Sequence, residues 1–249
     1  MGIKMRKGRI DMGRQEQELF RTLRTNIELS GDENRVIMVS SCMPDDGKTT
    51  VAYFLACTFA EAEKSVLLVD ADMRKSVLMK RLGMSGRERG LSEVLSGKEE
   101  LSDIICAMEK RGVYVLPPGK NCSNATELLG SEKFRRLIEE SRANYDYVIV
   151  DTPPLGSVID AAVAARCCDG SVMVVRYDYT SRADAQAIIE QLRAANENIL
   201  GVVLNQVNMK ERKSYTRRYG YGYRKYGYGY GYGYGVNENR DLEQVDNHE

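Results

Sequence analysis

Short apolar runs alternate with segments of helical periodicity along most of this 249-residue chain. Near-continuous apolar runs rich in β-branched residues are typical of strands that are buried on both faces. Because such strands alternate with helices here, the pattern predicts an α/β fold with a mainly parallel sheet that helices cover on both faces. The predicted strands are residues 36–39, 65–69, 147–150, 171–175 and 200–204, with a weaker strand at 113–116.

Helical patterns occupy the intervals between these strands, at residues 51–61, 131–142, 160–166 and 181–194. A further helix at 15–30 carries Leu19, Leu23 and Ile27 on one face. The length and composition fit one α/β domain with tails. We expect a basic segment over residues 1–14, one domain over 15–208 and a tail over 209–249.

The chain changes character after Met209, where tyrosine and glycine alternate. Nine of its 15 tyrosines lie between Tyr215 and Tyr234. Glycine at every second place has a large ordering cost and supplies no side chain for packing, so we expect a disordered tail rather than a strand. An adhesive aromatic-glycine segment is the alternative interpretation.

Charge and composition exclude several classes of protein. The formal net charge is zero, so no overall field favours nucleic acid, although residues 210–225 hold seven basic residues and one acidic residue. No apolar run approaches the roughly 18 residues that span a bilayer, and the N-terminus lacks the apolar core of a secretory signal. We therefore expect a cytoplasmic protein.

Cysteine and histidine usage argues against a zinc site and against disulfides. The six cysteines form no C-x-x-C pair, and in a reducing compartment we expect most of them to be small buried apolar residues. The single histidine, His248, lies near the end of the sequence, which disfavours a histidine-based triad or zinc site.

The most informative stretch is Ser40–Thr50, which follows the first predicted strand and contains Gly47-Lys48-Thr49. In a strand–turn–helix loop of this type, backbone N–H groups and the helix N-terminus attract phosphate. The lysine reaches the outer phosphates and the hydroxyl can bind magnesium. Cys42 stands where the usual loop has its first glycine. The acidic pair Asp45-Asp46 adds negative charge beside the expected phosphates.

Three carboxylates follow two other predicted strands. Asp70 and Asp72 come just after one strand, and Asp151 ends another. Each alone is equally consistent with a residue that starts a turn. Phosphoryl transfer, however, requires a lysine, a hydroxyl, magnesium and carboxylates in close proximity. Taken together with Gly47-Lys48-Thr49, these carboxylates predict a site for ATP or GTP with Mg²⁺.

These three segments resemble the Walker A, Walker A′ and Walker B motifs of the bacterial tyrosine kinases, a family with a P-loop NTPase-like fold. The resemblance extends over residues 16–207 and includes Glu18-x-x-Arg21-x-x-Arg24, which is similar to the family's oligomerisation motif. At helical spacing these charges share one face, although a solvated helix face would show the same pattern. The tyrosine-rich tail resembles the family's autophosphorylation cluster.

The resemblance implies a role for each matching residue. Lys48 would hold the β- and γ-phosphates, and Thr49, Asp72 and Asp151 would bind Mg²⁺. Asp70 would orient or deprotonate the attacking tyrosine, and Asn205 would contact adenine. The remaining ATP-binding residues implied are Asp45, Asp46, Gly47 and Thr50. The implied phosphoacceptors are Tyr215, Tyr219, Tyr221, Tyr223, Tyr226, Tyr228, Tyr230, Tyr232 and Tyr234.

The family also implies partners and a location. We expect an ATP-dependent tyrosine autokinase that forms a homo-oligomer, with a ring as the expected form, in which each tail enters the site of a neighbour. A transmembrane activator on a separate chain would recruit it to the inner face of the membrane. Protein tyrosine substrates, a phosphotyrosine phosphatase and control of capsular or exopolysaccharide synthesis or export belong to the same expectation, and nucleic acid does not.

Three other functions remain open from the residues. A partitioning or septum-positioning ATPase of the ParA/MinD kind shares the motifs, but such proteins carry a signature lysine where this chain has Met43. A reductase-type ATPase with an iron–sulfur cluster would need a cysteine motif that Cys122 and the adjacent Cys167-Cys168 do not form. A non-enzymatic polysaccharide-assembly adaptor would require an idle nucleotide site.

Overall fold

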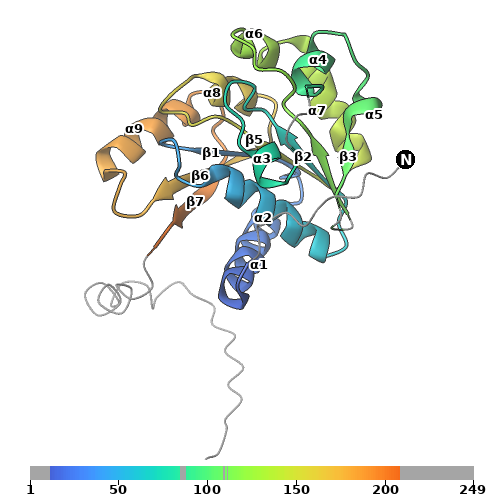
Figure 1. Cartoon of the computed structure of the whole chain (residues 1–249). Coiled ribbons are helices and arrows are strands. Elements are labelled where there is room, and N and C mark those ends of the chain that lie inside the picture. The colour runs from blue at the N-terminus through green and yellow to red at the C-terminus, as the bar shows by residue number, and fades with distance from the viewer. Residues whose placement is uncertain (1–11, 85–87, 109, 111, 208–249) are drawn as a thin grey trace, which may run out of the picture. The chain divides into compact units, whose positions relative to one another are not determined.

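A seven-stranded sheet in the order β3-β4-β2-β5-β1-β6-β7 forms the centre of the protein (Figure 1). The structure, a computed structural model, describes residues 12–84, 88–108, 110 and 112–207. All pairings are parallel except that of β3 with β4. The strands are β1 (Val36–Ser41), β2 (Val66–Asp70), β3 (Cys106–Ala107), β4 (Val113–Leu116), β5 (Tyr147–Asp151), β6 (Gly170–Arg176) and β7 (Ile199–Asn205).

Helices pack on both faces of this sheet (Figure 1). On one face α2 contacts β1, β2 and β5, and α1 packs on α2. The opposite face is covered by α7 and by α8 and α9, whose side chains share two apolar clusters with the sheet. The helices are α1 (Arg14–Leu29), α2 (Lys48–Glu61), α3 (Leu78–Arg81), α4 (Leu91–Leu95), α5 (Leu101–Ile104), α6 (Ala125–Leu129), α7 (Glu132–Asn144), α8 (Asp160–Ala165) and α9 (Arg182–Arg193).

The apolar runs form the core of the protein, because the central strands have a neighbour on each side and helices on both faces of the sheet. Every residue of β1, β2 and β6 except Arg176 is buried, as their unbroken apolar character predicts. In β1, Ile37 and Val39 face α2, and Met38 faces α8 and α9. The predicted parallel sheet with helices on both faces is confirmed.

The predicted elements lie within a few residues of the observed ones, and four short helices and one short strand were not predicted. Helices α3, α4, α5 and α6 span four or five residues each, and β3 spans two. A single turn of helix carries too little periodicity to separate it from a loop. The segment 1–11 and the tyrosine-rich tail lie outside the described residues, so both expectations stay predictions.

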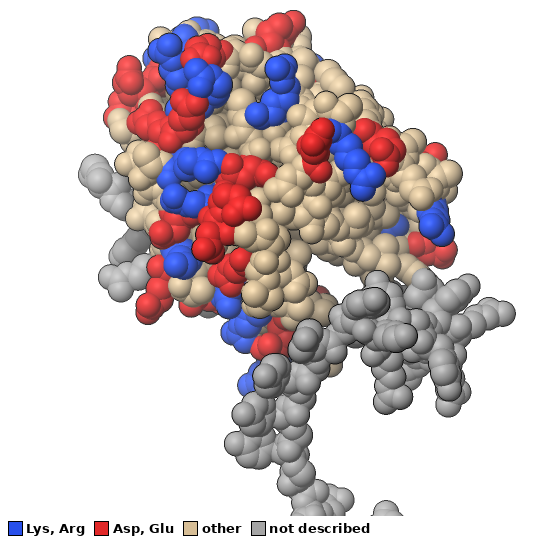
Figure 2. Space-filling model, turned by 180° about the vertical axis from the view of Figure 1, so that it is seen from behind, with Lys and Arg blue, Asp and Glu red and all other residues tan. Residues whose placement is uncertain are grey.

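Charged side chains are intermixed on the surface rather than separated by sign. On the face that Figure 2 presents, basic and acidic groups lie next to one another in several patches, with a broad uncharged area between them. On α7, for example, Arg135 pairs with both Glu132 and Glu139, and Arg136 lies 3.2 Å from Glu132. Exposed pairs of this kind contribute little to stability, so most of the stability of the fold comes from the apolar core.

The six cysteines are all free thiols. Cys42, Cys57 and Cys106 are buried, and the remaining three are half-buried. No helix among the described residues is long and apolar enough to cross a membrane.

Candidate nucleotide site

The carboxyl ends of β1, β2 and β5 bring together the charged residues that the sequence singled out. β5 pairs with both β1 and β2, and Asp70 and Asp151 are direct neighbours in the β2–β5 register. Lys48 begins α2 immediately after the loop that follows β1. A loop at the carboxyl edge of a parallel sheet is where ligands of such folds bind.

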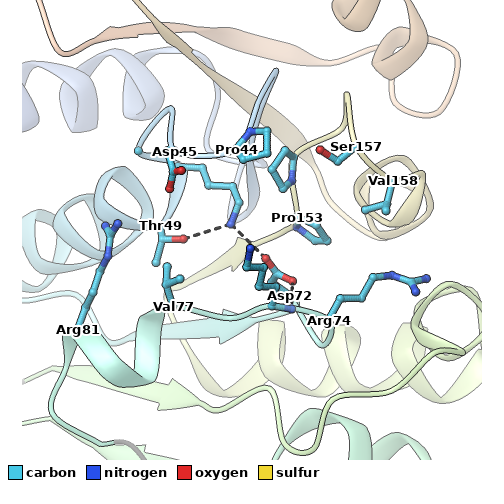
Figure 3. A pocket seen from close by; sticks show the side chains of 14 residues that line it. Pro44, Asp45, Thr49, Asp72, Arg74, Val77, Arg81, Pro153, Ser157 and Val158 are labelled. Atoms are coloured by element: carbon cyan, nitrogen blue, oxygen red, sulfur yellow. Dashed lines mark hydrogen bonds and ion pairs between the residues drawn. The ribbon is translucent and has the colours of Figure 1, made fainter.

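Lys48 lies between two carboxylates at the base of this site. Its Nζ is 3.5 Å from Asp72 Oδ2 and 3.6 Å from Asp151 Oδ1, and it donates to the Thr49 hydroxyl at 3.2 Å. Dashed lines in Figure 3 mark these contacts where they reach Thr49 and Asp72. Burial alone would lower the pKa of Lys48, but Asp151, Asp72 and Asp70 outweigh it and raise the pKa. The lysine is therefore firmly cationic.

The two strand-ending carboxylates crowd one another in a buried place. Asp70 is fully buried, and both burial and the charge of Asp151 raise its pKa well above its ordinary value. Burial also raises the pKa of Asp151, against the lowering effect of Lys48. Among the described residues, Asp151 Oδ1 accepts no hydrogen bond. A buried carboxylate oxygen that accepts no hydrogen bond, although Lys48 Nζ lies 3.6 Å from it, favours a cation or a donor that is supplied with a ligand.

Asp70 lies behind the cavity rather than in its wall. Its carboxyl accepts the Ser76 hydroxyl, and the Asp72 N–H at 3.2 Å. Asp72 lines the cavity itself. The two acids of the Asp70-Ala71-Asp72 segment therefore differ in place, since one braces the turn after β2 and the other faces the ligand space.

A cavity of about 230 Å³ extends outward from Lys48 (Figure 3). The phosphate loop, the turn after β2 and the loop after β5 form its walls. Apolar side chains make up much of the lining. The lining also includes the Asp72 carboxylate and several basic side chains. The lining residues include Pro44, Val77, Pro153, Pro154 and Val158, with Arg74, Lys75 and Arg81 as the cations.

The phosphate loop has the backbone conformation of an anion-binding turn. Gly47 adopts a φ of 98° and Asp45 a φ of 63°, both in the left-handed region. A side chain at position 47 would collide with the Asn205 amide, since an ideal Cβ there lies 2.1 Å from Asn205 Nδ2. Glycine is required at this position on both grounds.

The structure accounts for the two features of the loop that the sequence left unexplained. Cys42 is fully buried beneath the loop, and burial together with Asp46 and Asp184 raises its pKa to about 11. Asp46 is also buried, and its Oδ2 accepts the Met43 N–H at 2.8 Å. The carboxylate of Asp46 thus braces the loop from within, and only Asp45 of the acidic pair lines the cavity.

The other predicted site residues lie around the loop. The Thr50 hydroxyl contacts Arg81 of α3. Asn205, at the end of β7, donates from Nδ2 to the Asp46 carbonyl at 2.7 Å. In this conformation its amide holds the phosphate loop, and its predicted contact with adenine stays a prediction.

One residue pair of this region was missed by the sequence reasoning. Asp160, at the start of α8, is fully buried and accepts both Arg74 Nε at 2.7 Å and Thr126 Oγ1 at 2.6 Å. Burial would raise the pKa of Asp160, but the bonds from Arg74 and Thr126 outweigh it, and the pKa is lowered. The pair ties the turn after β2 to the loop after β5, both of which wall the cavity. The position of Asp160 before an alanine-rich helix was its only signal.

The three residues of the predicted oligomerisation motif differ in exposure and in their contacts within the chain. Glu18 and Arg21 form an exposed pair on α1. Arg24 is mostly buried and donates from Nη1 to the Thr58 carbonyl of α2 at 2.9 Å. Arg24 therefore fastens α1 to α2 within the chain, and Arg21 also approaches α2, with its Nε 3.7 Å from Glu61 Oε2. The side chains of Glu18 and Arg21 are nevertheless exposed at the surface.

The fold, the phosphate loop and the clustered carboxylates define a P-loop nucleotide-binding protein. Residues 34–206 match the AAA domain family. The structure also resembles the MinD septum site-determining protein of Pyrococcus horikoshii, solved with Mg-ADP, with a TM-score of 0.62 and 27% identity over 74% of this chain and 76% of that one.

Relatives with higher sequence identity than MinD identify the family within this class of nucleotide-binding proteins. The tyrosine-protein kinase CpsD of Streptococcus agalactiae is 38% identical over 200 residues, which are 80% of this chain and 87% of that protein. The tyrosine-protein kinase etk of Escherichia coli K12 is 38% identical over 80% of this chain and 28% of its own length. The solved kinase domain of E. coli ETK superposes with a TM-score of 0.73 and 34% identity, covering 88% of this chain and 80% of that domain. The chain belongs to the bacterial tyrosine-kinase family.

Proposed function

We propose that the protein is an ATP-dependent tyrosine autokinase, which transfers the γ-phosphate of ATP to tyrosines of its own segment 215–234. The observation that carries the proposal is the placement of Lys48 between Asp72 and Asp151, at the base of a cavity with apolar walls. The names of its relatives support the same chemistry.

The phosphate loop and its carboxylates suit a nucleotide with magnesium. Lys48 would contact the β- and γ-phosphates, and Thr49, Asp72 and Asp151 would hold Mg²⁺ directly or through water. Asp151 Oδ1 fits such a role because it accepts no hydrogen bond among the described residues, and Mg²⁺ commonly uses one or two carboxylates together with substrate phosphates. When bound, the ion supplies positive charge that offsets the charge developing on the phosphates.

The outer part of the cavity suits a phenol. Pro44, Val77, Pro153 and Val158 offer apolar contact to an aromatic ring beyond Lys48. A phenol with an ordinary pKa near 10 is a weak nucleophile until its proton has an acceptor. The phenol oxygen would attack the γ-phosphorus, its proton would pass to a carboxylate, and the bond to the β–γ bridging oxygen would break to release ADP.

The carboxylate that receives this proton lies in the segment after β2. Asp72 lines the cavity, and Asp70 lies behind it in contact with Ser76. Asp70 would orient or deprotonate the phenol only after the turn after β2 had rearranged, or by way of Asp72. We therefore keep both carboxylates in the proposed catalytic set.

Incubation of the purified protein with γ-labelled ATP tests this function. Transfer predicts alkali-stable phosphotyrosine on residues 215–234. Rapid hydrolysis with no label on tyrosine would instead support a partitioning-type ATPase, and binding with neither reaction would support an adaptor.

The finer biology is also part of the proposal. Tails would enter the sites of neighbouring subunits in a homo-oligomer, with Glu18, Arg21 and Arg24 at or beside the contact. Each added phosphate brings about −1.5 to −2 charge, so phosphorylation would favour dissociation by repulsion. The proposal also includes a transmembrane activator on a separate chain, which would recruit the protein to the inner face of the membrane. A phosphotyrosine phosphatase would reverse the modification, and the cycle would control capsular or exopolysaccharide synthesis.

Mixing two variants tests transfer between subunits. A full-length Lys48→Met protein serves as acceptor, and an active protein that lacks residues 208–249 serves as donor. Label on the acceptor supports transfer between subunits. An unlabelled acceptor beside a donor that phosphorylates an added tyrosine peptide would restrict transfer to one chain.

A further inference from the structure

Four carbonyl groups of the phosphate loop accept hydrogen bonds, and three of the four donors come from distant segments of the chain. The Cys42 carbonyl accepts the Gly156 N–H at 3.1 Å, and the Met43 carbonyl accepts the Ser41 hydroxyl at 2.8 Å. The Asp45 carbonyl accepts Gln206 Nε2 at 3.0 Å. The Asp46 carbonyl accepts Asn205 Nδ2 at 2.7 Å, as described above. Asn205, the last residue of β7, and Gln206, the residue after it, thus bind two consecutive carbonyls of the loop.

A held carbonyl fixes the direction of the next N–H. The peptide unit is planar and trans, so the C=O of one residue and the N–H of the next point in opposite directions. No cis peptide bond occurs among the described residues. When Gln206 and Asn205 draw the carbonyls of Asp45 and Asp46 outward, the N–H groups of Asp46 and Gly47 must point to the opposite side of the loop.

Those two N–H groups are among the donors of the loop that are left for a phosphate. The Met43 N–H is already donated to the Asp46 carboxylate, and Pro44 has no N–H. Neither the Asp46 N–H nor the Gly47 N–H donates to an acceptor in the part of the chain that the structure describes. Successive free N–H groups in a turn with left-handed residues form an anion-binding concavity.

We propose that Asn205 and Gln206 are positioning residues of the phosphate loop: their side-chain amides hold the Asp46 and Asp45 carbonyls outward and so aim the Gly47 and Asp46 N–H groups at the phosphates. The inference rests on nucleotide binding at this loop. It gives Asn205 a role toward the phosphates, which is distinct from a contact with the base.

The backbone at both ends of this contact supports a built arrangement. Gln206 adopts a φ of 59° and Asp45 a φ of 63°, which non-glycine residues adopt only when their surroundings hold them. Asn205 Nδ2 packs so tightly on Gly47 that no side chain fits between them. The amides therefore act at short range on the loop, and they do so from a strand that is separated from β1 by β6.

Ligands with and without a base separate the two possible roles. We suggest measuring calorimetrically how Mg-ADP and Mg-tripolyphosphate bind to Asn205→Leu and Gln206→Met, which keep side-chain size and remove the donor. Gln191→Met, on α9 and outside these contacts, is the matched control. Gln206 is exposed, so its variant should fold even if the Asn205 variant does not, and thermal unfolding reports the folding of each.

Positioning predicts that each variant loses affinity for both ligands by the same factor, about fivefold for one lost hydrogen bond, whereas Gln191→Met binds like the wild type. In the transfer reaction the KM for ATP should rise while the KM for an added tyrosine peptide stays unchanged. Wild-type affinity in both variants would overturn the inference, as would loss of ADP binding with tripolyphosphate binding intact. Failure of the wild type to bind either ligand would overturn the proposed nucleotide site itself.

Discussion

Lys48 Nζ lies 3.6 Å from Asp151 Oδ1, across the boundary between two paired strands of the sheet. The loop after β1 delivers the lysine, and β5 ends at the carboxylate, so the geometry of the parallel sheet sets this distance. Asp72 completes the arrangement from the other side of β5. Removing the cation would leave the buried carboxylates unpaired, and losing one partner of a buried charge pair is costly.

The Asp160–Arg74 pair predicts a pH-dependent contribution to stability. Asp160→Asn should lower the free energy of unfolding at pH 7 by about 1 to 2 kcal/mol, because Arg74 loses its charged partner while the amide still fits the site. The lowered pKa of Asp160 means that its contribution is complete above the unfolded value near 3.8 and is lost as the pH falls through the folded pKa.

Urea unfolding of wild type and Asp160→Asn between pH 3 and pH 7 measures this difference. The gap between the two proteins should narrow as the pH falls below about 3.8. Asp103→Asn, on the short helix α5, is a control whose gap should stay small throughout. A gap for Asp160→Asn that does not narrow in acid would refute the ionic origin of the contribution.

Buried Cys42 should resist alkylation. Its pKa of about 11 leaves almost no thiolate at pH 8, and the side chain is inaccessible in the folded protein. Iodoacetamide at pH 8 should therefore label half-buried Cys122 and Cys167 before Cys42, as read by peptide mass spectrometry. Labelling in urea should make all three equal. Early modification of Cys42 in the native protein would show that the loop opens.

The triplet on α1 should separate assembly from stability. Glu18→Ala removes an exposed side chain, so it should weaken the proposed oligomer without changing the thermal midpoint. Arg24→Ala also removes the hydrogen bond to Thr58, so it should lower the midpoint by a few degrees as well. Light scattering and thermal unfolding of both variants measure the two effects. Equal midpoints for the two variants would argue against the intrachain role of Arg24.

The sequence predicted the sheet because its strands are buried on both faces, and a run such as Val36–Val39 has few other uses. It also placed Lys48, Asp72 and Asp151 near one another, since the carboxyl ends of parallel strands share one edge. These inferences needed only local pattern and a general rule of fold geometry.

Side-chain contacts between distant segments were beyond the sequence. Nothing in the sequence around Gln206 indicates that its amide reaches the carbonyl of a residue 161 positions earlier in the chain. Asp70 and Asp72 have the same sequence signal, yet one faces the cavity and the other lies behind it. Such differences depend on how the turn after the strand packs, which no periodicity records.

Mass spectrometry of residues 215–234 after incubation with Mg-ATP tests the proposed kinase most directly. The measurement compares the wild type with Lys48→Met, and Lys98→Met at an exposed position is the matched control. We predict phosphotyrosine in the wild type and in Lys98→Met, and at least a hundredfold less in Lys48→Met, because the lysine stabilises charge in the transition state. Equal phosphotyrosine in purified Lys48→Met, or none in a wild type that hydrolyses ATP rapidly, would contradict the proposed function.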